Sequence, residues 1–153
     1  MLLGSLGQLD LDVSGDDTLA PSPNRPLRVL IVEDTPERQD ILTALYRQHA
    51  WILAHTGPRA IMLLRAYDFD IVSLDYNLGG ELTGEDVAEF LASAPGKALR
   101  IIIHSMNPDG AARIKTLLPE AILYPVHRMV RSNRIFKKLQ ESISAEGVAY
   151  EWK

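Results

Sequence analysis

Three short apolar runs in this 153-residue chain each end in polar residues. They are residues 29–32 before Glu33, residues 71–74 before Asp75, and residues 101–103 before His104. Short runs rich in Val and Ile are typical of strands buried on both faces, as in a parallel sheet. Because the carboxyl ends of parallel strands meet at one edge of a sheet, we expect these polar residues to be neighbours in space.

Helical patterns alternate with the apolar runs along the body of the chain. Strands are expected near residues 27–33, 51–54, 70–74, 99–103 and 121–124. A helix follows each one, and the last helix carries Ile135, Leu139 and Ile143 at the spacing of one helical face. Five such units joined by short connections predict an α/β fold, a five-stranded doubly wound parallel sheet with helices on both faces.

The two ends of the chain differ from this body. Gly, Ser, Asp and Pro dominate residues 1–26, which we interpret as an N-terminal tail, either flexible or ordered by a partner. Apolar and acidic residues alternate over residues 9–13, so this part could add as a strand to a protein partner. Residues 27–144 form the predicted folded domain, and residues 145–153 a C-terminal extension.

Composition excludes several classes of function. The chain has no Cys, which rules out disulfides, thiolate chemistry and Cys-ligated metals. A net charge of −4 gives no overall attraction to nucleic acid or to an anionic membrane. We find neither a signal peptide nor an apolar run of roughly 18 residues, so we expect a cytoplasmic protein without a membrane partner.

The polar strand ends predict a site for a metal ion and a phosphate group. Carboxylates of Glu33, Asp34 and Asp75 can hold a hard divalent cation, Mg²⁺ or Mn²⁺, although acids at strand ends can also merely cap helices or face water. His104 can transfer a proton, or it can be a structural side chain hydrogen-bonded at a strand end. Asn107 can orient a phosphate oxygen at a helix N-terminus, or it can serve only as the helix cap.

The segments 29–36 (VLIVEDTP) and 70–75 (DIVSLD), with Ser105 after the fourth strand, resemble a response-regulator receiver domain over about residues 27–140. The resemblance implies the flavodoxin-like (βα)₅ receiver fold with strand order 2-1-3-4-5. It implies a metal held by the acidic residues and by the backbone carbonyl of Asn77, with Asp75 as phosphoryl acceptor and Ser105 contacting the phosphoryl group. Tyr124 departs from the pattern, because receivers carry a Lys before the proline that ends the fifth strand.

Two further segments are similar to a divergent branch, the cyclic-phosphate processing receiver domains. They are the loop at residues 74–84 (LDYNLGGELTG) and residues 103–108 (IHSMNP). This similarity implies binding or hydrolysis of a cyclic phosphate on a nucleotide or an RNA end. The glycines of the loop, Gly79, Gly80 and Gly84, resemble a phosphate cradle, but a turn that needs positive φ explains them equally well.

These observations lead to one main hypothesis and two alternatives. The main hypothesis is a divalent-metal site that binds or hydrolyses a phosphate ester, with Asp75 and His104 as catalytic residues and Ser105 and Asn107 binding phosphate. The first alternative is an inactive pseudo-receiver that acts in regulation or assembly through residues 1–26 or the last helix. The second is an ordinary phospho-acceptor at Asp75, which the missing Lys disfavours. A basic cluster leads into the last helix and could attract an RNA end, although a solvated helix face is the commoner explanation: Arg128, Arg131, Arg134, Lys137 and Lys138.

Overall fold

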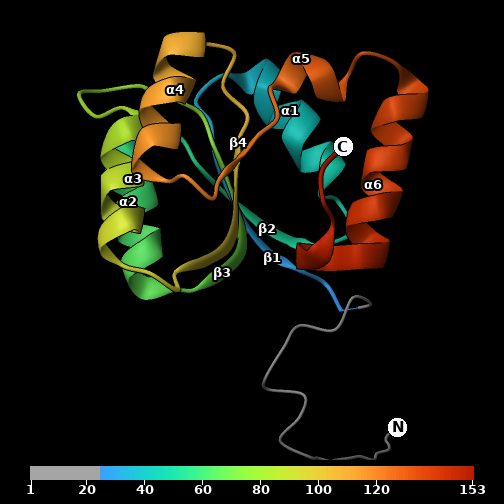
Figure 1. The fold of residues 1–153 in the computed structure, drawn as a ribbon, viewed down its shortest axis with the longest axis horizontal. Helices are drawn as coiled ribbons and strands as arrows, with labels where there is room; N and C mark the ends of the chain where they lie inside the picture. Colours follow the sequence, from blue (N-terminus) through green and yellow to red (C-terminus); the bar gives the residue numbers. More distant parts are fainter. Residues whose placement is uncertain (1–24) are drawn as a thin grey trace, which may run out of the picture.

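The structure is a computed structural model that describes residues 25–153. Most of the predicted N-terminal tail therefore lies outside the described residues, and its proposed role as an added strand remains a prediction. Within the described range, a single parallel sheet is covered by helices on both faces (Figure 1).

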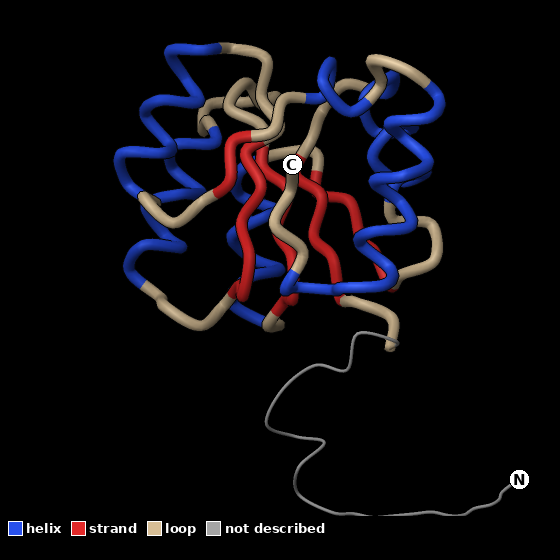
Figure 2. Tube along the Cα trace, turned by 45° about the vertical axis from the view of Figure 1, so that its right-hand side comes forward, coloured by secondary structure: helices blue, strands red, loops and turns tan. Residues whose placement is uncertain are grey.

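The sheet has the predicted number and order of strands. Its strands are β1 (Arg28–Val32), β2 (Ala50–Ala54), β3 (Phe69–Leu74), β4 (Ala98–Ile103) and β5 (Ile122–Leu123). They pair in parallel in the order β2-β1-β3-β4-β5, which confirms the predicted flavodoxin-like topology. Figure 2 shows the strands side by side, and because all pairs are parallel their carboxyl ends lie at a common edge. In this topology strand order reverses between β1 and β3, which is where such folds bind ligands.

Helices follow the strands as the sequence predicted, and two short helices are added. They are α1 (Pro36–Leu45), α2 (Gly57–Ala66), α3 (Gly84–Ser93), α4 (Pro108–Leu117), α5 (Val126–Met129), α6 (Asn133–Glu146) and the 3₁₀ helix η3 (Gly147–Ala149). Figure 1 shows α2, α3 and α4 against one face of the sheet and α1 and α6 against the other. The short α5 was not anticipated, and the predicted last helix is α6.

Two apolar cores explain why the central strands are mostly apolar. Along β1, Leu30 and Val32 pack in the core under α2, α3 and α4, whereas Val29 and Ile31 pack in the core under α1 and α6. Every residue of β3 is buried. Since successive side chains of a strand point to opposite faces, a strand with a core on each side needs apolar residues on both faces. The two polar exceptions in β3, Asp70 and Ser73, are buried and hydrogen-bonded.

The residues before α4 and α1 use their side chains differently, and the difference bears on the site. Asn107 caps α4, because its side chain accepts a hydrogen bond from the backbone of Gly110 at 3.0 Å. Thr35 stands at the cap position of α1, followed by Pro36, but its side chain makes no capping bond. The Thr35 hydroxyl instead donates to Asp34 at 3.3 Å and accepts from Arg38 at 2.9 Å. The Thr35 side chain therefore contributes to the site and does not cap α1.

The end of the chain packs back onto the domain. The predicted boundary at residue 144 falls inside α6, and the segment after the helix contributes buried Trp152 to the core shared with α1 and α6. Arg100 of β4 holds this segment by donating to the carbonyls of Val148 at 2.6 Å and Tyr150 at 3.3 Å. Among residues 25–153, no helix combines the length and the apolar character needed to cross a membrane.

Candidate functional site at the carboxyl edge of the sheet

Three buried side chains from three different strands converge at the carboxyl edge of the sheet. Glu33 follows β1, Asp75 follows β3 and His104 follows β4, and each offers an oxygen or nitrogen atom within 4.8 Å of the others. All three are nearly or completely buried. The parallel topology thus brings together residues that are about 30 to 70 positions apart in the sequence, in the way expected for strand ends at a switch point.

Both ring nitrogens of His104 are engaged inside the protein. Nε2 lies 2.8 Å from Oε1 of Glu33, and Nδ1 lies 2.7 Å from the hydroxyl of Ser73 on β3. The His104 side chain has no exposed surface. Because a proton-transfer group must reach the reacting atoms directly or through a water, this geometry favours the hydrogen-bonded structural interpretation of His104. Its contact with Glu33 still ties it to the site.

Asp34 and Asn77 lie toward the outer side of the same edge. Asp34 is half-buried, and its carboxylate accepts a hydrogen bond from the hydroxyl of Thr35. Asn77 is exposed in the loop that follows Asp75. Gly79 of this loop lies close to Asp34, since a Cβ at position 79 would come within 3.8 Å of Oδ2. The Asp34 carboxylate therefore lies beside the loop and is not part of the close cluster of Glu33, Asp75 and His104.

Ser105 and Asn107 form a short turn that begins α4. The Ser105 hydroxyl, itself buried, accepts from the backbone N–H of Asn107 at 3.2 Å. The side-chain carbonyl of Asn107 is occupied by its capping bond to Gly110. Asn107 thus acts as the cap of α4 through its side-chain oxygen, while its side-chain NH2 group stays available to a ligand.

Arg38 is a member of the site that the sequence did not reveal. From the first turn of α1, its Nε donates to Oε1 of Glu33 at 3.1 Å, and Nη2 lies 3.5 Å from Oδ2 of Asp75. Its side chain is 29% exposed, so the guanidinium sits at the mouth of the site. A signal was present in the sequence: a cation in the first turn is unfavourable for the helix dipole, and Arg38 follows the acidic pair by one turn. Only the rotation of α1 over the sheet shows that it points inward.

The two deepest carboxyls have opposite pKa shifts. Burial raises the pKa of Glu33, but the hydrogen bond and charge of His104, with hydrogen bonds from Arg38 and the Thr35 backbone, outweigh burial and hold the pKa at about 2. Burial, reinforced by the charge of Glu33, raises the pKa of Asp75 above its usual value despite the opposing effect of His104. Glu33 is therefore firmly ionised, and Asp75 is the carboxyl that accepts a proton most readily or gains most from a cation.

Two glycines of the loop after Asp75 have structural reasons of their own. Gly80 has φ of +89°, a conformation in which glycine is favoured. Gly84 packs so tightly that a Cβ there would collide with the backbone carbonyl of Asp75. The positive-φ interpretation therefore accounts for Gly80, and close backbone approach accounts for Gly84. In both cases the requirement of the turn explains the residue without a bound phosphate.

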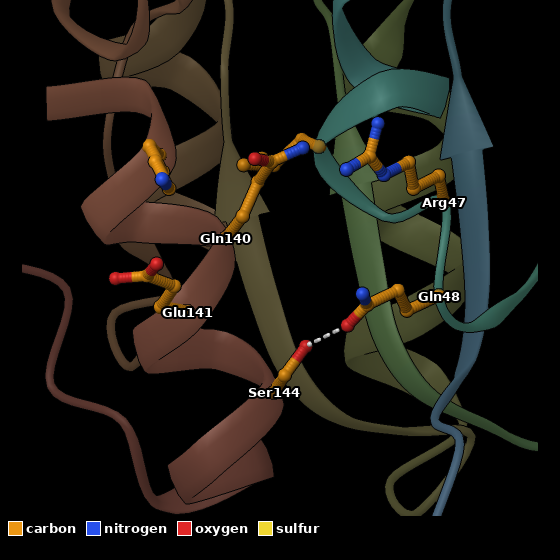
Figure 3. Close-up of a pocket in the computed structure, with 7 residues that line it drawn as sticks. Arg47, Gln48, Gln140, Glu141 and Ser144 are labelled. Carbon is orange, nitrogen blue, oxygen red and sulfur yellow. Dashed lines mark hydrogen bonds between the residues drawn. The ribbon is translucent and has the colours of Figure 1, made fainter. Parts of the chain in front are cut away.

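Two other features lie away from this edge. The hollow in Figure 3, of about 130 Å³, lies between the loop after α1 and α6, where Ser144 donates to Gln48 at 3.2 Å. The hollow shares no residue with the site, and the hydrogen bond beside it links α6 to the loop after α1. Within the basic cluster, Arg128 stacks on the ring of Tyr124 at 4.3 Å, and Lys137 and Lys138 are exposed on α6. A role for this cluster with RNA remains a prediction.

A family model for the cyclic-phosphate processing receiver domain matches residues 28–120, which is more than half of the chain. The chain belongs to this family. The match extends over β1 to the end of α4 and includes every residue of the site described above. Membership of the family confirms the resemblance seen in the loop at residues 74–84 and in residues 103–108.

Relatives and solved structures agree with this assignment. The chain is 33% identical over 82 residues to protein-glutamate methylesterase/protein-glutamine glutaminase 3 of Myxococcus xanthus, covering 51% of this chain and 23% of that protein. It thus spans about a quarter of the relative's length. The response regulator TrrA of Thermotoga maritima, solved with Mg²⁺-BeF, superposes with a TM-score of 0.56 at 23% identity over 73% of this chain and 97% of that chain.

A second solved structure gives the same fold. The phosphorylated cyanobacterial phytochrome response regulator RcpA has a TM-score of 0.59 at 20% identity, over 83% of this chain and 94% of that chain. At such identities the similarity establishes the receiver fold. The cyclic-phosphate processing receiver described here therefore has a receiver fold and a buried acidic cluster in which a metal site is suggested.

Proposed function

We propose that this receiver binds a divalent cation and a phosphate ester at the carboxyl edge of the sheet, and that it hydrolyses a cyclic phosphate there. The observation that carries the proposal is the convergence of Glu33, Asp75 and His104 within 4.8 Å at the switch point of strand order. The raised pKa of Asp75 adds support, because a carboxyl beside another buried carboxylate gains from a bound cation.

The donor set fits Mg²⁺ or Mn²⁺. Carboxylates of Asp34 and Asp75, with the backbone carbonyl of Asn77, are hard oxygen ligands of the kind these ions prefer, and the ion would neutralise phosphate charge and activate water. We assign Glu33 to the inner side of the site, since its carboxylate is already bonded to His104 and Arg38. TrrA, whose structure holds Mg²⁺-BeF, supports a cation and a phosphate analogue in this fold.

The roles of Asp75 and His104 follow from the bonds that change during hydrolysis. In hydrolysis of a 2′,3′-cyclic phosphate, the oxygen of water bonds to phosphorus while the bond from phosphorus to one ribose oxygen breaks. The water proton is lost and that ribose oxygen gains one, so the product is a phosphomonoester. Asp75 takes part in this step as a ligand of the ion that would activate the water, because its carboxyl, beside the buried carboxylate of Glu33, gains from a bound cation. His104 is buried behind Glu33, and we assign it a positioning role instead of direct proton transfer.

The test combines metal binding with turnover. The chain is titrated with Mn²⁺ by electron paramagnetic resonance and incubated with Mn²⁺ and 2′,3′-cyclic nucleotides, with product separated by chromatography. We expect Asp75→Asn to abolish turnover and weaken Mn²⁺ binding, while the exposed Asp40→Asn on α1 leaves both unchanged. Absence of Mn²⁺ binding by the unaltered chain would refute the proposal. Binding without turnover of any cyclic or linear ester would refute its hydrolytic part.

A second candidate function is a pseudo-receiver that performs no chemistry. The observation that favours it is the pairing of Arg38 with both Glu33 and Asp75. The guanidinium offsets the negative charge of these carboxylates without a bound metal ion. Tyr124 at the lysine position points the same way, because a phosphorylation switch needs a cation there. Incubation with acetyl phosphate, with beryllofluoride as a binding control, separates this candidate from a phospho-acceptor. An adduct on Asp75, detected by mass spectrometry, would exclude the pseudo-receiver.

A further inference from the structure

Tyr124, which stands where receivers carry a lysine, makes its contacts with the C-terminal segment of this chain. Tyr124 is almost fully buried, with its ring 5.4 Å from the ring of Trp152. Its hydroxyl donates to the backbone carbonyl of Lys153 at 3.0 Å. The Tyr124 side chain therefore anchors the C-terminal segment and does not serve the carboxyl edge. A phosphate bound beside Asp75 needs its cation from another element.

Within residues 25–153, Arg38 is the one basic side chain of Arg or Lys paired with Asp75. Nε is held by Glu33, and Nη2 is held by the hydroxyl of Thr35, which leaves Nη1 without a hydrogen bond in the described part of the chain. A guanidinium offers five donors in a rigid fork that suits phosphate oxygens. The Arg38 side chain is also partly exposed, so solvent reaches part of it.

The Arg38 side chain is oriented from below by a chain of buried hydrogen bonds. Ser73 contacts His104, His104 contacts Glu33, and Glu33 accepts from Nε of Arg38. Each of the three supporting side chains is completely buried. An ionised Glu33 held from both sides fixes one edge of the guanidinium plane, so little conformational entropy remains to be lost when the other edge binds a ligand.

We propose that Arg38 is the phosphate-binding cation of this site, replacing the lysine that is missing at position 124, and that Ser73, His104 and Glu33 are its positioning residues. The inference rests on the proposed function, since it concerns the same phosphate. A phosphate at this edge faces the carboxylates of Asp34 and Asp75, and a fixed guanidinium offsets that repulsion. Arg38 lies on the helix that follows β1, whereas position 124 follows β5, and β3 and β4 lie between these two strands in the sheet. The cation therefore reaches the site from the β1 side and not from the β5 side.

The proposal makes metal and phosphate respond differently to one substitution. Arg38 shares Asp75 with any cation bound there, so its removal frees a carboxylate oxygen for Mn²⁺ while it deprives phosphate of a donor. Arg38→Gln keeps most of the aliphatic side chain and removes the charge. We expect this variant to bind inorganic phosphate or beryllofluoride at least about tenfold more weakly and to bind Mn²⁺ no more weakly than the unaltered chain.

The experiment uses the full chain, with Mn²⁺ followed by electron paramagnetic resonance and with phosphate or beryllofluoride followed by calorimetry at saturating Mn²⁺. Arg59→Gln is the matched control, because Arg59 occupies the same position after a threonine cap in α2 and is exposed. Arg38→Lys should recover part of the lost affinity, since charge returns without the fork. His104→Gln, if folded, should weaken phosphate binding but leave the Mn²⁺ affinity nearly unchanged.

The outcomes separate this inference from the proposed function. Phosphate affinity that depends on Asp75 but stays within about twofold in Arg38→Gln would overturn the role of Arg38 and leave the proposed function standing. Weaker binding of both Mn²⁺ and phosphate in Arg38→Gln would also overturn it, because that result indicates a merely structural ion pair. No phosphate binding by the unaltered chain would overturn both the proposed phosphate site and this inference.

Discussion

The buried Glu33 is expected to make the stability of the protein depend on pH in a measurable way. Its pKa is about 2 in the folded protein, against 4.5 for an unperturbed glutamate side chain, a difference of about 2.5 units. At about 1.4 kcal/mol for each unit, the ionised carboxylate contributes about 3 kcal/mol to the free energy of unfolding at pH 7. Glu33 has no exposed surface, so this contribution needs no discount for solvent screening.

The sign of the effect follows from the lowered pKa. Stability from Glu33 is fully present above pH 4.5 and is lost as the pH falls toward 2, because the carboxylate must then take up a proton. Integration between the two pKa values predicts that about 2 kcal/mol of the contribution is gone at pH 3. Glu33→Gln removes this titration and keeps the shape of the side chain.

Urea unfolding at pH 7 and pH 3, followed by circular dichroism, checks the prediction. We expect Glu33→Gln to be less stable than the unaltered chain by about 3 kcal/mol at pH 7 and by only about 1 kcal/mol at pH 3. Glu37→Gln, an exposed acid in the same helix that carries Arg38, is the control and should follow the unaltered chain within about 0.5 kcal/mol. An equal difference at both pH values would refute the argument that His104 and Arg38 hold Glu33 ionised.

Three further substitutions test other parts of the site. Gly84→Ala should destabilise the protein by about 1–3 kcal/mol in thermal unfolding, since the added Cβ meets a backbone carbonyl; an unchanged melting temperature would contradict the close approach. His104→Phe should cost about 3–5 kcal/mol in urea unfolding, because it leaves the buried carboxylate of Glu33 without one partner, and a loss below about 1 kcal/mol would argue against the pair. Asn107→Ala should cost about 1 kcal/mol by loss of the α4 cap, whereas Asn107→Asp should keep most of it.

Membership of the receiver family places strong constraints on fold and weaker ones on chemistry. The carboxyl edge, the switch point and the acidic cluster belong to the architecture, and this architecture supports many activities. The features of this chain that bear on its chemistry are the buried His104 behind Glu33, Arg38 at the mouth of the site and Tyr124 packed under the C-terminal segment. Substitutions at these three residues can distinguish a site that processes phosphate from one that performs no chemistry.

The amino-acid sequence by itself determined the sheet, its helices and the meeting of Glu33, Asp75 and His104. These are consequences of local periodicity: a Val- and Ile-rich run buried on both faces makes a parallel strand, and parallel strands bring their carboxyl ends together. The cap of α4 at Asn107 was predictable for the same reason, since capping depends on residues close in the chain.

Only the tertiary structure decided which way the decisive side chains point. Arg38 reaches the site because packing of α1 on the sheet turns it inward, and local periodicity does not specify that rotation relative to Asp75. His104 is withdrawn from solvent because Ser73 and Glu33, from two other strands, hydrogen-bond both of its ring nitrogens in the core. The Tyr124 hydroxyl is held by the backbone carbonyl of a residue almost 30 positions away in the sequence. Contacts between distant segments depend on how whole elements pack, so neither the burial of the histidine nor the source of the cation could be derived from spacing along the chain.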